Sequence, residues 1–147
     1  MYDEEDFDYE WGAVMDLEPR IYSSAVELCA ELGERRTYSG RDALVRIGDV
    51  YVYVCLQKSV GPLADPRAGA EVVRRIPLTV QKVMVPRAHR RTGLCTELFR
   101  ALRAASSPDP VRVQSVVSPK MEGLLRKLGA TLEPYGGSTW WLPDEVV

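Results

Sequence analysis

The chain has 147 residues, of which 46% are apolar and 27% charged, the balance of one ordinary globular domain. No apolar run approaches the ~20 residues that a membrane-spanning helix needs, and the acidic first residues are unlike a secretory signal. Three cysteines without paired spacing and a single histidine argue against a disulfide framework and a metal site. We therefore expect a cytoplasmic protein with no membrane segment and no metal.

The net charge of −2 hides an uneven distribution. Residues 1–18 hold eight acidic side chains and no basic one, which leaves 13 acidic residues against all 19 basic ones over 19–147. The second segment therefore carries about +6. This surplus suits a ligand with phosphate groups, but it is too small to indicate nucleic-acid binding, and we do not expect a nucleic-acid partner.

We predict an acidic N-terminal arm over residues 1–18 and a single domain over residues 19–147. The arm contains four aromatic residues, too many for a plain disordered tail: Tyr2, Phe7, Tyr9 and Trp11. Two interpretations stay open. Either the arm is partly ordered with its aromatic side chains packed on the domain, which we favour, or it attracts a basic partner.

The first predicted helix covers about residues 22–33. Ser23 and Ser24 precede apolar residues at helical spacing, and Gly33 can end the helix. The helix therefore has a polar start, an apolar face and a glycine stop.

Two extended runs follow, at 43–47 and 50–56, and Gly48-Asp49 between them is a two-residue hairpin signal. Residues 57–75 contain several glycines and prolines, which predicts a loop. The loop is long for a compact domain, and such loops are often functional or mobile.

Residues 76–85 predict a central strand, which Pro86 closes because proline cannot continue a strand ladder. A second helix is predicted over 94–105 from its apolar face. Residues 106–110 contain two prolines and break that helix, and residues 111–117 predict another strand.

Pro119 can start a third helix, which stops at Gly129. Its buried side is formed by Met121, Leu124, Leu125 and Leu128. Residues 131–134 and 139–142 predict two closing strands around a glycine turn. The order of elements predicts an α/β (α+β layered) domain with a mixed central sheet.

The strongest chemical signal lies between Val83 and Leu98, where a strand ends, a short basic turn follows and a helix begins at once. The first backbone N–H groups of such a helix have no intrahelical acceptors, and the helix dipole adds positive potential, so a diphosphate would fit there. Gly93 would let the backbone approach a ligand, and Arg90 and Arg91 would add charge. Taken alone, the pattern leaves a phosphate site and a plain basic turn about equally open.

This segment resembles the acyl-CoA loop of the GNAT superfamily, usually written Q/R-x-x-G-x-G/A, with Arg90, Gly93 and Cys95 at its three defined positions. Residues 111–129, VRVQSVVSPKMEGLLRKLG, resemble the second half of that fold. The resemblance covers about residues 76–134. It implies a GNAT-like acyl-CoA N-acyltransferase fold, with helices on both faces of the mixed central sheet.

The resemblance also implies that strands 78–85 and 111–117 splay apart and hold the pantetheine arm of acetyl-CoA, while backbone amides of the turn hold the diphosphate. The residues implied to bind the cofactor are Val83, Met84, Val85, Arg90, Arg91, Thr92, Gly93, Leu94 and Cys95. The implied reaction transfers an acetyl group from acetyl-CoA to an amine, which a base deprotonates while an acid protonates the leaving thiolate. The acceptor amine is not implied.

The usual catalytic residues of the family are missing. Leu125 stands where many members carry the tyrosine that acts as the acid, and Ser118 stands where many carry asparagine. No glutamate lies on residues 78–85, and the amide of Gln81 cannot act as a base at neutral pH. Ser118 and Tyr135 are weak candidates for a substitute. The sequence therefore leaves the catalytic residues unassigned.

Cys95 stands where the family prefers glycine or alanine. A thiol at a helix N-terminus can have a lowered pKa, but we favour a small buried filler over a reactive thiol. His89 is expected to be solvated or to face phosphate rather than to catalyse.

Two functions therefore remain. The leading one is an N-acetyltransferase of unknown acceptor. The alternative is a catalytically degenerate GNAT-fold protein with a structural or regulatory role that binds a protein partner, since small phage-encoded GNAT-like proteins, including virion proteins, look similar. A nucleic-acid modifier has only the modest basic surplus in its favour.

Overall fold

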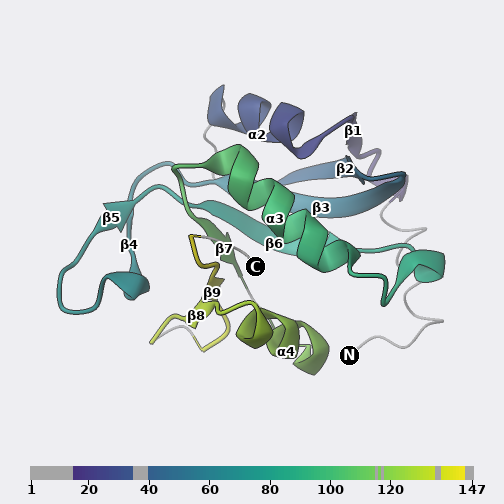
Figure 1. The fold of residues 1–147 in the computed structure, drawn as a ribbon. Coiled ribbons are helices and arrows are strands. Elements are labelled where there is room, and N and C mark those ends of the chain that lie inside the picture. Colours follow the sequence, from purple (N-terminus) through teal and green to yellow (C-terminus); the bar gives the residue numbers. More distant parts are fainter. Residues whose placement is uncertain (1–14, 35–39, 115, 117, 135–136, 145–147) are drawn as a thin grey trace.

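The computed structural model describes residues 15–34, 40–114, 116, 118–134 and 137–144. These form a seven-stranded mixed sheet in the order β1-β2-β3-β6-β7-β9-β8 and a separate hairpin, β4-β5 (Figure 1). The strands of the sheet are β1 (Arg20–Tyr22), β2 (Arg41–Ile47), β3 (Val50–Lys58), β6 (Leu78–Met84), β7 (Val111–Val113), β8 (Thr131–Leu132) and β9 (Trp140–Trp141). The hairpin consists of β4 (Leu63–Ala64) and β5 (Arg74–Arg75).

Three described helices pack against the sheet: α2 (Ala25–Glu34), α3 (Leu94–Ser106) and α4 (Pro119–Lys127). Helices α2 and α3 pack side by side, and the buried Leu125 of α4 belongs to the same hydrophobic core as their buried residues (Figure 1). This confirms the predicted layered α/β architecture with a mixed sheet. None of the described helices has both the length and the apolar character needed to cross a membrane.

Local polar contacts explain where the first helix begins. The backbone N–H of Glu27 donates to Ser24 Oγ at 3.2 Å, and the Glu27 carboxylate accepts from the backbone N–H of Ser23 at 3.1 Å. These reciprocal contacts satisfy amides that the first helical turn leaves open. The serine pair, which the sequence places before the predicted helix, therefore caps its start.

The hairpin predicted at Gly48-Asp49 is confirmed. Strands β2 and β3 pair in antiparallel register from Ile47 opposite Val50 to Arg41 opposite Leu56. Side chains alternate across this hairpin. Val52 and Val54 belong to the main core under α2 and α3, whereas Tyr53 lies with Leu44, Met84 and Cys55 in a smaller cluster.

Strand β1 was not predicted. Its three residues pair with β2 in parallel, Arg20 opposite Ala43 and Tyr22 opposite Val45. The segment is too short to show an alternating pattern, and its partner lies beyond the first helix. Its extended form therefore depends on tertiary pairing rather than on local sequence.

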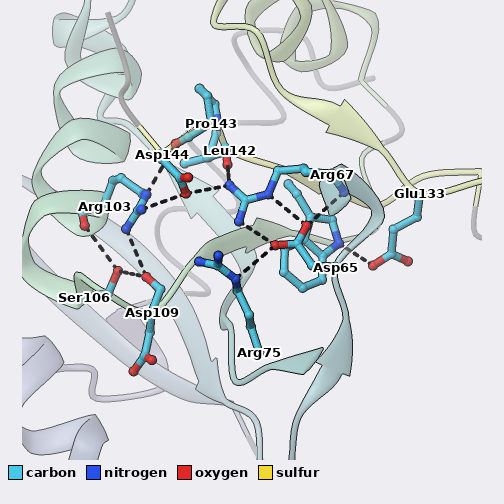
Figure 2. A network of polar contacts seen from close by, with 11 residues as sticks. Asp65, Arg67, Arg75, Arg103, Ser106, Asp109, Glu133, Leu142, Pro143 and Asp144 are labelled. Atoms are coloured by element: carbon cyan, nitrogen blue, oxygen red, sulfur yellow. Dashed lines mark hydrogen bonds and ion pairs between the residues drawn. The ribbon is translucent and has the colours of Figure 1, made fainter. Parts of the chain in front are cut away.

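The loop predicted over residues 57–75 is only partly a loop. Strand β3 continues to Lys58, and β4 pairs with β5 in antiparallel register. Arg67 anchors this hairpin to the chain end by donating to the Leu142 carbonyl at 2.7 Å and to Asp144 at 3.0 Å (Figure 2). Charge pairing between segments distant in sequence, rather than strand propensity, orders this region.

A polar network joins the hairpin to the last turn of α3 (Figure 2). Asp65, buried between two arginines, accepts from Arg67 at 2.7 Å and lies 3.5 Å from Arg75. Asp144 bridges Arg67 and Arg103, each at 3.0 Å. The network fixes the end of α3 opposite to the basic turn that precedes this helix.

Candidate functional site

The sheet opens between its two central parallel strands. Strands β6 and β7 pair only from Leu78 opposite Val111 to Val80 opposite Val113, and the last bond runs from Gln114 N–H to the Val80 carbonyl at 2.9 Å. Beyond it, the Val116 N–H donates to the Ser138 carbonyl at 2.7 Å. The chain after β7 thus pairs with the C-terminal segment instead of β6.

Strand β6 continues past this point with a partner on one side. Its residues Lys82, Val83 and Met84 pair with β3, and no described residue of β7 pairs with them. The predicted strand over 111–117 is therefore shorter, ending at Val113 among the described residues. The free edge of β6 presents backbone N–H and C=O groups, which can bind an extended ligand.

A β-bulge bends β6 where the opening starts. Leu56 pairs with Val80, but its neighbour Cys55 pairs with Lys82, so Gln81 is an extra residue in the strand. Such a bulge bends its strand and increases the local twist. Gly40 lies against the bulge so closely that an added Cβ would sit 2.1 Å from Gln81 Oε1. A side chain at this position would displace the Gln81 amide and the Cys55 thiol.

The basic turn leads from β6 to α3 through a short 3-10 helix, η2 (Arg87–His89). Arg91 and Gly93 both have positive φ, at 62° and 82°. For an arginine this conformation is uncommon and strained, and such strain often occurs at functional sites. Thr92 Oγ1 donates to the His89 carbonyl at 2.6 Å, which closes the turn.

The start of α3 leaves backbone donors available. Its first intrahelical bond runs from the Glu97 N–H to the Gly93 carbonyl at 3.1 Å. The amides from Gly93 to Thr96 therefore precede the first donor of the helix. Together with the helix dipole they form a site that favours an anion.

The charged side chains of the turn differ in exposure. Arg87, His89 and Arg91 are exposed, whereas Arg90 is half-buried and its Nε atom has no contact with solvent. Arg91 is therefore the arginine of the predicted pair whose charge faces solvent beside the start of α3.

Cys95 is partly buried and packs against the main core. Burial raises the pKa of its thiol, so the helix start does not produce a thiolate. This agrees with the expected filler and argues against a reactive cysteine.

The residues at the family's catalytic positions have structural roles. Leu125 is fully buried in the core, so α4 has no acid at that place. Ser118 caps α4 by accepting from the Met121 N–H at 3.4 Å. The Gln81 amide donates to Gln57 Oε1 at 3.0 Å. Tyr135 lies outside the described residues.

The sequence reasoning missed one polar pair beside the opening. Tyr53 on β3 donates its hydroxyl hydrogen to Asp42 on β2, on the sheet face opposite α2 and α3. The signal was available, because the hairpin register places both residues on one face of alternating strands.

No protein-family model matches the chain, and no curated protein matches it either. Solved structures do match in fold. AtaT complexed with acetyl-methionyl-tRNAfMet is 14% identical, with 71% of each chain covered and a TM-score of 0.50. The KacTA-DNA complex is 14% identical over 76% of this chain and 72% of that one, with a TM-score of 0.47.

A further match is the "histone acetyltransferase HPA2 and related acetyltransferase" from Corynebacterium glutamicum, 16% identical over 76% of this chain and 66% of that one, with a TM-score of 0.43. A mutant AtaT toxin bound to the C-terminus of the antitoxin AtaR and acetyl-CoA is also similar, at 16% identity. The chain spans 58% of that protein's length. At these identities the likeness concerns the fold.

Proposed function

We propose that this chain, which has the fold of the GNAT superfamily, is an acyl-CoA N-acyltransferase that transfers an acetyl group from acetyl-CoA to an amine. One observation carries the proposal. The edge of β6 loses its β7 partner after Val80 and leads, through a strained turn, to the open amides at the start of α3. A strand edge beside an anion site suits a ligand with a chain of amides and a diphosphate.

In this arrangement the main chain of Val83, Met84 and Val85 would pair with the pantetheine arm. Their side chains are buried or half-buried, so backbone groups are what this edge offers. The diphosphate would lie on the amides of Gly93, Leu94 and Cys95.

Arg91 would contribute charge to the diphosphate from its exposed position. Arg90 and Thr92 would shape the turn, since Thr92 already bonds to His89 and Arg90 is half-buried. The proposed ligand set keeps all the residues that the family resemblance implied.

The reaction itself requires a neutral amine to attack the thioester carbonyl. The C–N bond forms, the C–S bond breaks, and the thiolate takes up a proton. Positioning the two reactants accounts for much of the rate gain in such reactions. An enzyme without the family's tyrosine acid would depend chiefly on this positioning.

The test is release of free thiol from acetyl-CoA in the presence of a panel of primary amines. We expect release above the hydrolysis background with at least one amine, and a matching acetylated product by mass spectrometry. Acetyl-CoA binding without release by any amine would contradict the proposed activity.

One observation favours a second candidate, a GNAT-fold binding protein without catalysis. Leu125 fills the place of the acid tyrosine and is fully buried in the core. This candidate predicts acetyl-CoA or protein binding but no thiol release. The same panel therefore separates the two functions.

The amine panel should include an aminoacyl-tRNA, whose α-amine is a primary amine. Our expectation of no nucleic-acid partner finds no support among the similar structures, since AtaT is complexed with acetyl-methionyl-tRNAfMet and KacTA with DNA. Their partners are not thereby partners of this chain. Acetylation of an aminoacyl-tRNA, but of no small amine, would make our expectation wrong.

A further inference from the structure

A small buried apolar cluster lies on the sheet face that is turned away from α2 and α3. It consists of Leu44 on β2, Tyr53 on β3 and Met84 on β6, which are 6%, 2% and 5% exposed. The register makes Tyr53 the partner of both Leu44 and Met84, so the three residues are neighbours across the strands. We call this set the Tyr53 cluster. It is separate from the main core.

The described apolar side chains do not cover this cluster. Among them, Cys55 is the only partly buried one that packs against it, and Cys55 belongs to the same sheet face. Tyr51 lies two residues before Tyr53 on β3 and faces the same side, yet it is 42% exposed. A large side chain on an open sheet face keeps its outer end in water, as Tyr51 does. The burial of Tyr53 therefore calls for a segment that lies across this face.

The β4–β5 hairpin covers the other end of the same face. One row of residues crosses the strands there: Gln57, Thr79, Arg112 and Trp141. Trp141 is fully buried, and the Arg67 guanidinium lies over its ring, 5.7 Å from the centroid. Gln57 is four residues from Tyr53 along β3, or about 13 Å at the rise of a strand. The Tyr53 cluster therefore lies well away from this anchor of the hairpin.

Residues 1–14 join the described structure beside the face of the cluster. They precede Met15, which stands five residues before the edge strand β1. Ile21 of β1 pairs with Leu44, so its side chain belongs to that face. From β1 to Met84 on β6 there are three strand spacings, about 14 Å. Fourteen residues span about 21 Å as a helix and about 46 Å when extended, so they reach across in either form.

The other segments outside the described residues are short or join the structure elsewhere. Residues 35–39 end at Gly40, which precedes Leu44 by four residues, about 13 Å of extended chain. Residues 145–147 follow Asp144, which is ion-paired at the hairpin end. None of the rest is longer than two residues. The N-terminal segment is therefore the one that fits by length and by place.

The aromatic residues of the N-terminal segment are spaced for a common face. Phe7 and Trp11 are four residues apart, which puts both on one side of a helix and of an extended strand alike. Burying two such rings removes a large apolar area from water. The pair therefore suits a cover for the Tyr53 cluster.

Two exposed cations flank the cluster on the same face. Arg46 follows Leu44 by two residues on β2, and Lys82 pairs with Cys55 on the β3–β6 ladder. Residues 1–14 hold six acidic side chains and no basic one. The face and the segment therefore complement each other in charge as well as in apolar area.

We propose that residues 1–14 dock across the sheet and bury Phe7 and Trp11 on the Tyr53 cluster. The sheet face turned away from α2 and α3 is thus an intramolecular docking surface for the acidic arm. This gives a surface to the packed form of the arm. The inference does not rest on the proposed acyl transfer.

The test uses the full chain with 13C-labelled leucine and methionine methyl groups and measures NOEs to aromatic protons. We expect NOEs from Phe7 and Trp11 to the methyl groups of Leu44 and Met84, in addition to those from Tyr53. The methyl groups of Leu28 are the internal control. They are fully buried in the main core on the opposite face and should show no NOE to either ring.

Phe7→Ala and Trp11→Ala should each remove the NOEs of the deleted ring and shift the methyl resonances of Leu44 and Met84. Val26→Ala is the matched control, because it removes an apolar side chain that is 66% exposed on α2. It should leave both resonances in place. If either alanine variant fails to fold, the NOEs of the wild type still decide the question.

Three results would overturn the inference. The first is the absence of NOEs from Phe7 and Trp11 to the cluster in the folded wild type. The second is NOEs to Leu44 and Met84 from the ring of Tyr38 instead, which would make residues 35–39 the cover. The third is NOEs that arise only between differently labelled copies, which would make a second copy the occupant. None of these results would bear on acetyl-CoA binding, so the proposed function is tested separately.

Discussion

Gly93 sets the geometry at the start of α3. Its φ of 82° lies in the left-handed region, and apart from its chain neighbours no described residue has an atom within 4 Å of the place where a Cβ would be. A substitution there is therefore limited by backbone conformation rather than by space.

We predict that Gly93→Glu abolishes acetyl-CoA binding, because it adds a negative charge beside the proposed diphosphate position. Gly93→Gln imposes the same backbone strain and nearly the same volume without the charge. It should therefore retain more affinity than Gly93→Glu in calorimetry. Equal affinities in the two variants would show that the diphosphate does not lie at this helix start.

Leu125 is fully buried on α4, and the sequence correctly placed it in the core. Leu125→Ala should lower the free energy of unfolding by ~2–5 kcal/mol, through lost burial and the cavity that remains. Denaturant unfolding measures this change. Leu132→Ala is the control, since Leu132 is 38% exposed and its loss should cost about 0.5 kcal/mol or less.

At the scale of elements, the β4–β5 hairpin depends on the charge of Asp65. Burial opposes ionisation of this carboxyl, but its bonds to Arg67 and the charge of Arg75 outweigh burial and lower its pKa. The folded pKa then lies below the unfolded value of about 3.9. The stabilisation is therefore complete above that value and is lost as the pH falls through the folded pKa.

We predict that Asp65→Asn flattens the dependence of unfolding free energy on pH between neutral and acidic solution. Denaturant unfolding at a series of pH values measures the slope. Burial opposes ionisation of Asp144, but Arg67 and Arg103 outweigh it and lower the pKa of this carboxyl. Asp144 should therefore account for the pH dependence of the unfolding free energy that is left in Asp65→Asn. Asp49→Asn should keep the slope of the wild type, and an unchanged slope in Asp65→Asn would contradict the account.

The elements differ in how far the sequence predicts them. The helices α2, α3 and α4 were predicted within a few residues, because each combines a helical apolar period with a local start or stop signal. Strand β1 and the β4–β5 hairpin were missed because two or three residues carry no period, and distant segments order them. The strand expected to reach residue 117 ends at Val113, where its partner strand bends away at the bulge.

The candidate site also has parts that local sequence predicts and parts that depend on strand pairing. The turn, Gly93 and the start of α3 follow from local sequence, since strand end, glycine and helix start are contiguous. The pairing of Asp42 with Tyr53 requires the hairpin register, and its place beside Gln81 requires the next ladder as well. Contacts that depend on two ladders cannot be found by scanning for a motif.

For the whole molecule, the charge asymmetry predicts an effect of the N-terminal arm, whose first 14 residues lie outside the described residues. Attraction between the acidic arm and the rest of the chain should be screened over ~8 Å at physiological ionic strength. Deletion of residues 1–10 should then tighten acetyl-CoA binding at low salt and change it little at high salt. Replacing Asp3, Glu4 and Glu5 by their amides should act in the same direction.

Calorimetry at two salt concentrations measures both changes. If neither the deletion nor the amide substitutions alter the affinity for acetyl-CoA at low or high salt, the arm does not compete with an anionic ligand. The arm would then be a structural segment or a contact for another protein.

The most direct test of the central claim is to map acetyl-CoA on the wild-type chain by its effect on backbone amide NMR shifts. The account predicts saturable shifts in two groups, one along the edge of β6 at Val83 and Val85, the other from Arg91 to Cys95. Desulfo-CoA should shift the second group equally, because it keeps the diphosphate. Absence of saturable shifts at millimolar ligand, or shifts confined to other elements, would contradict the claim that β6 and α3 form an acyl-CoA site.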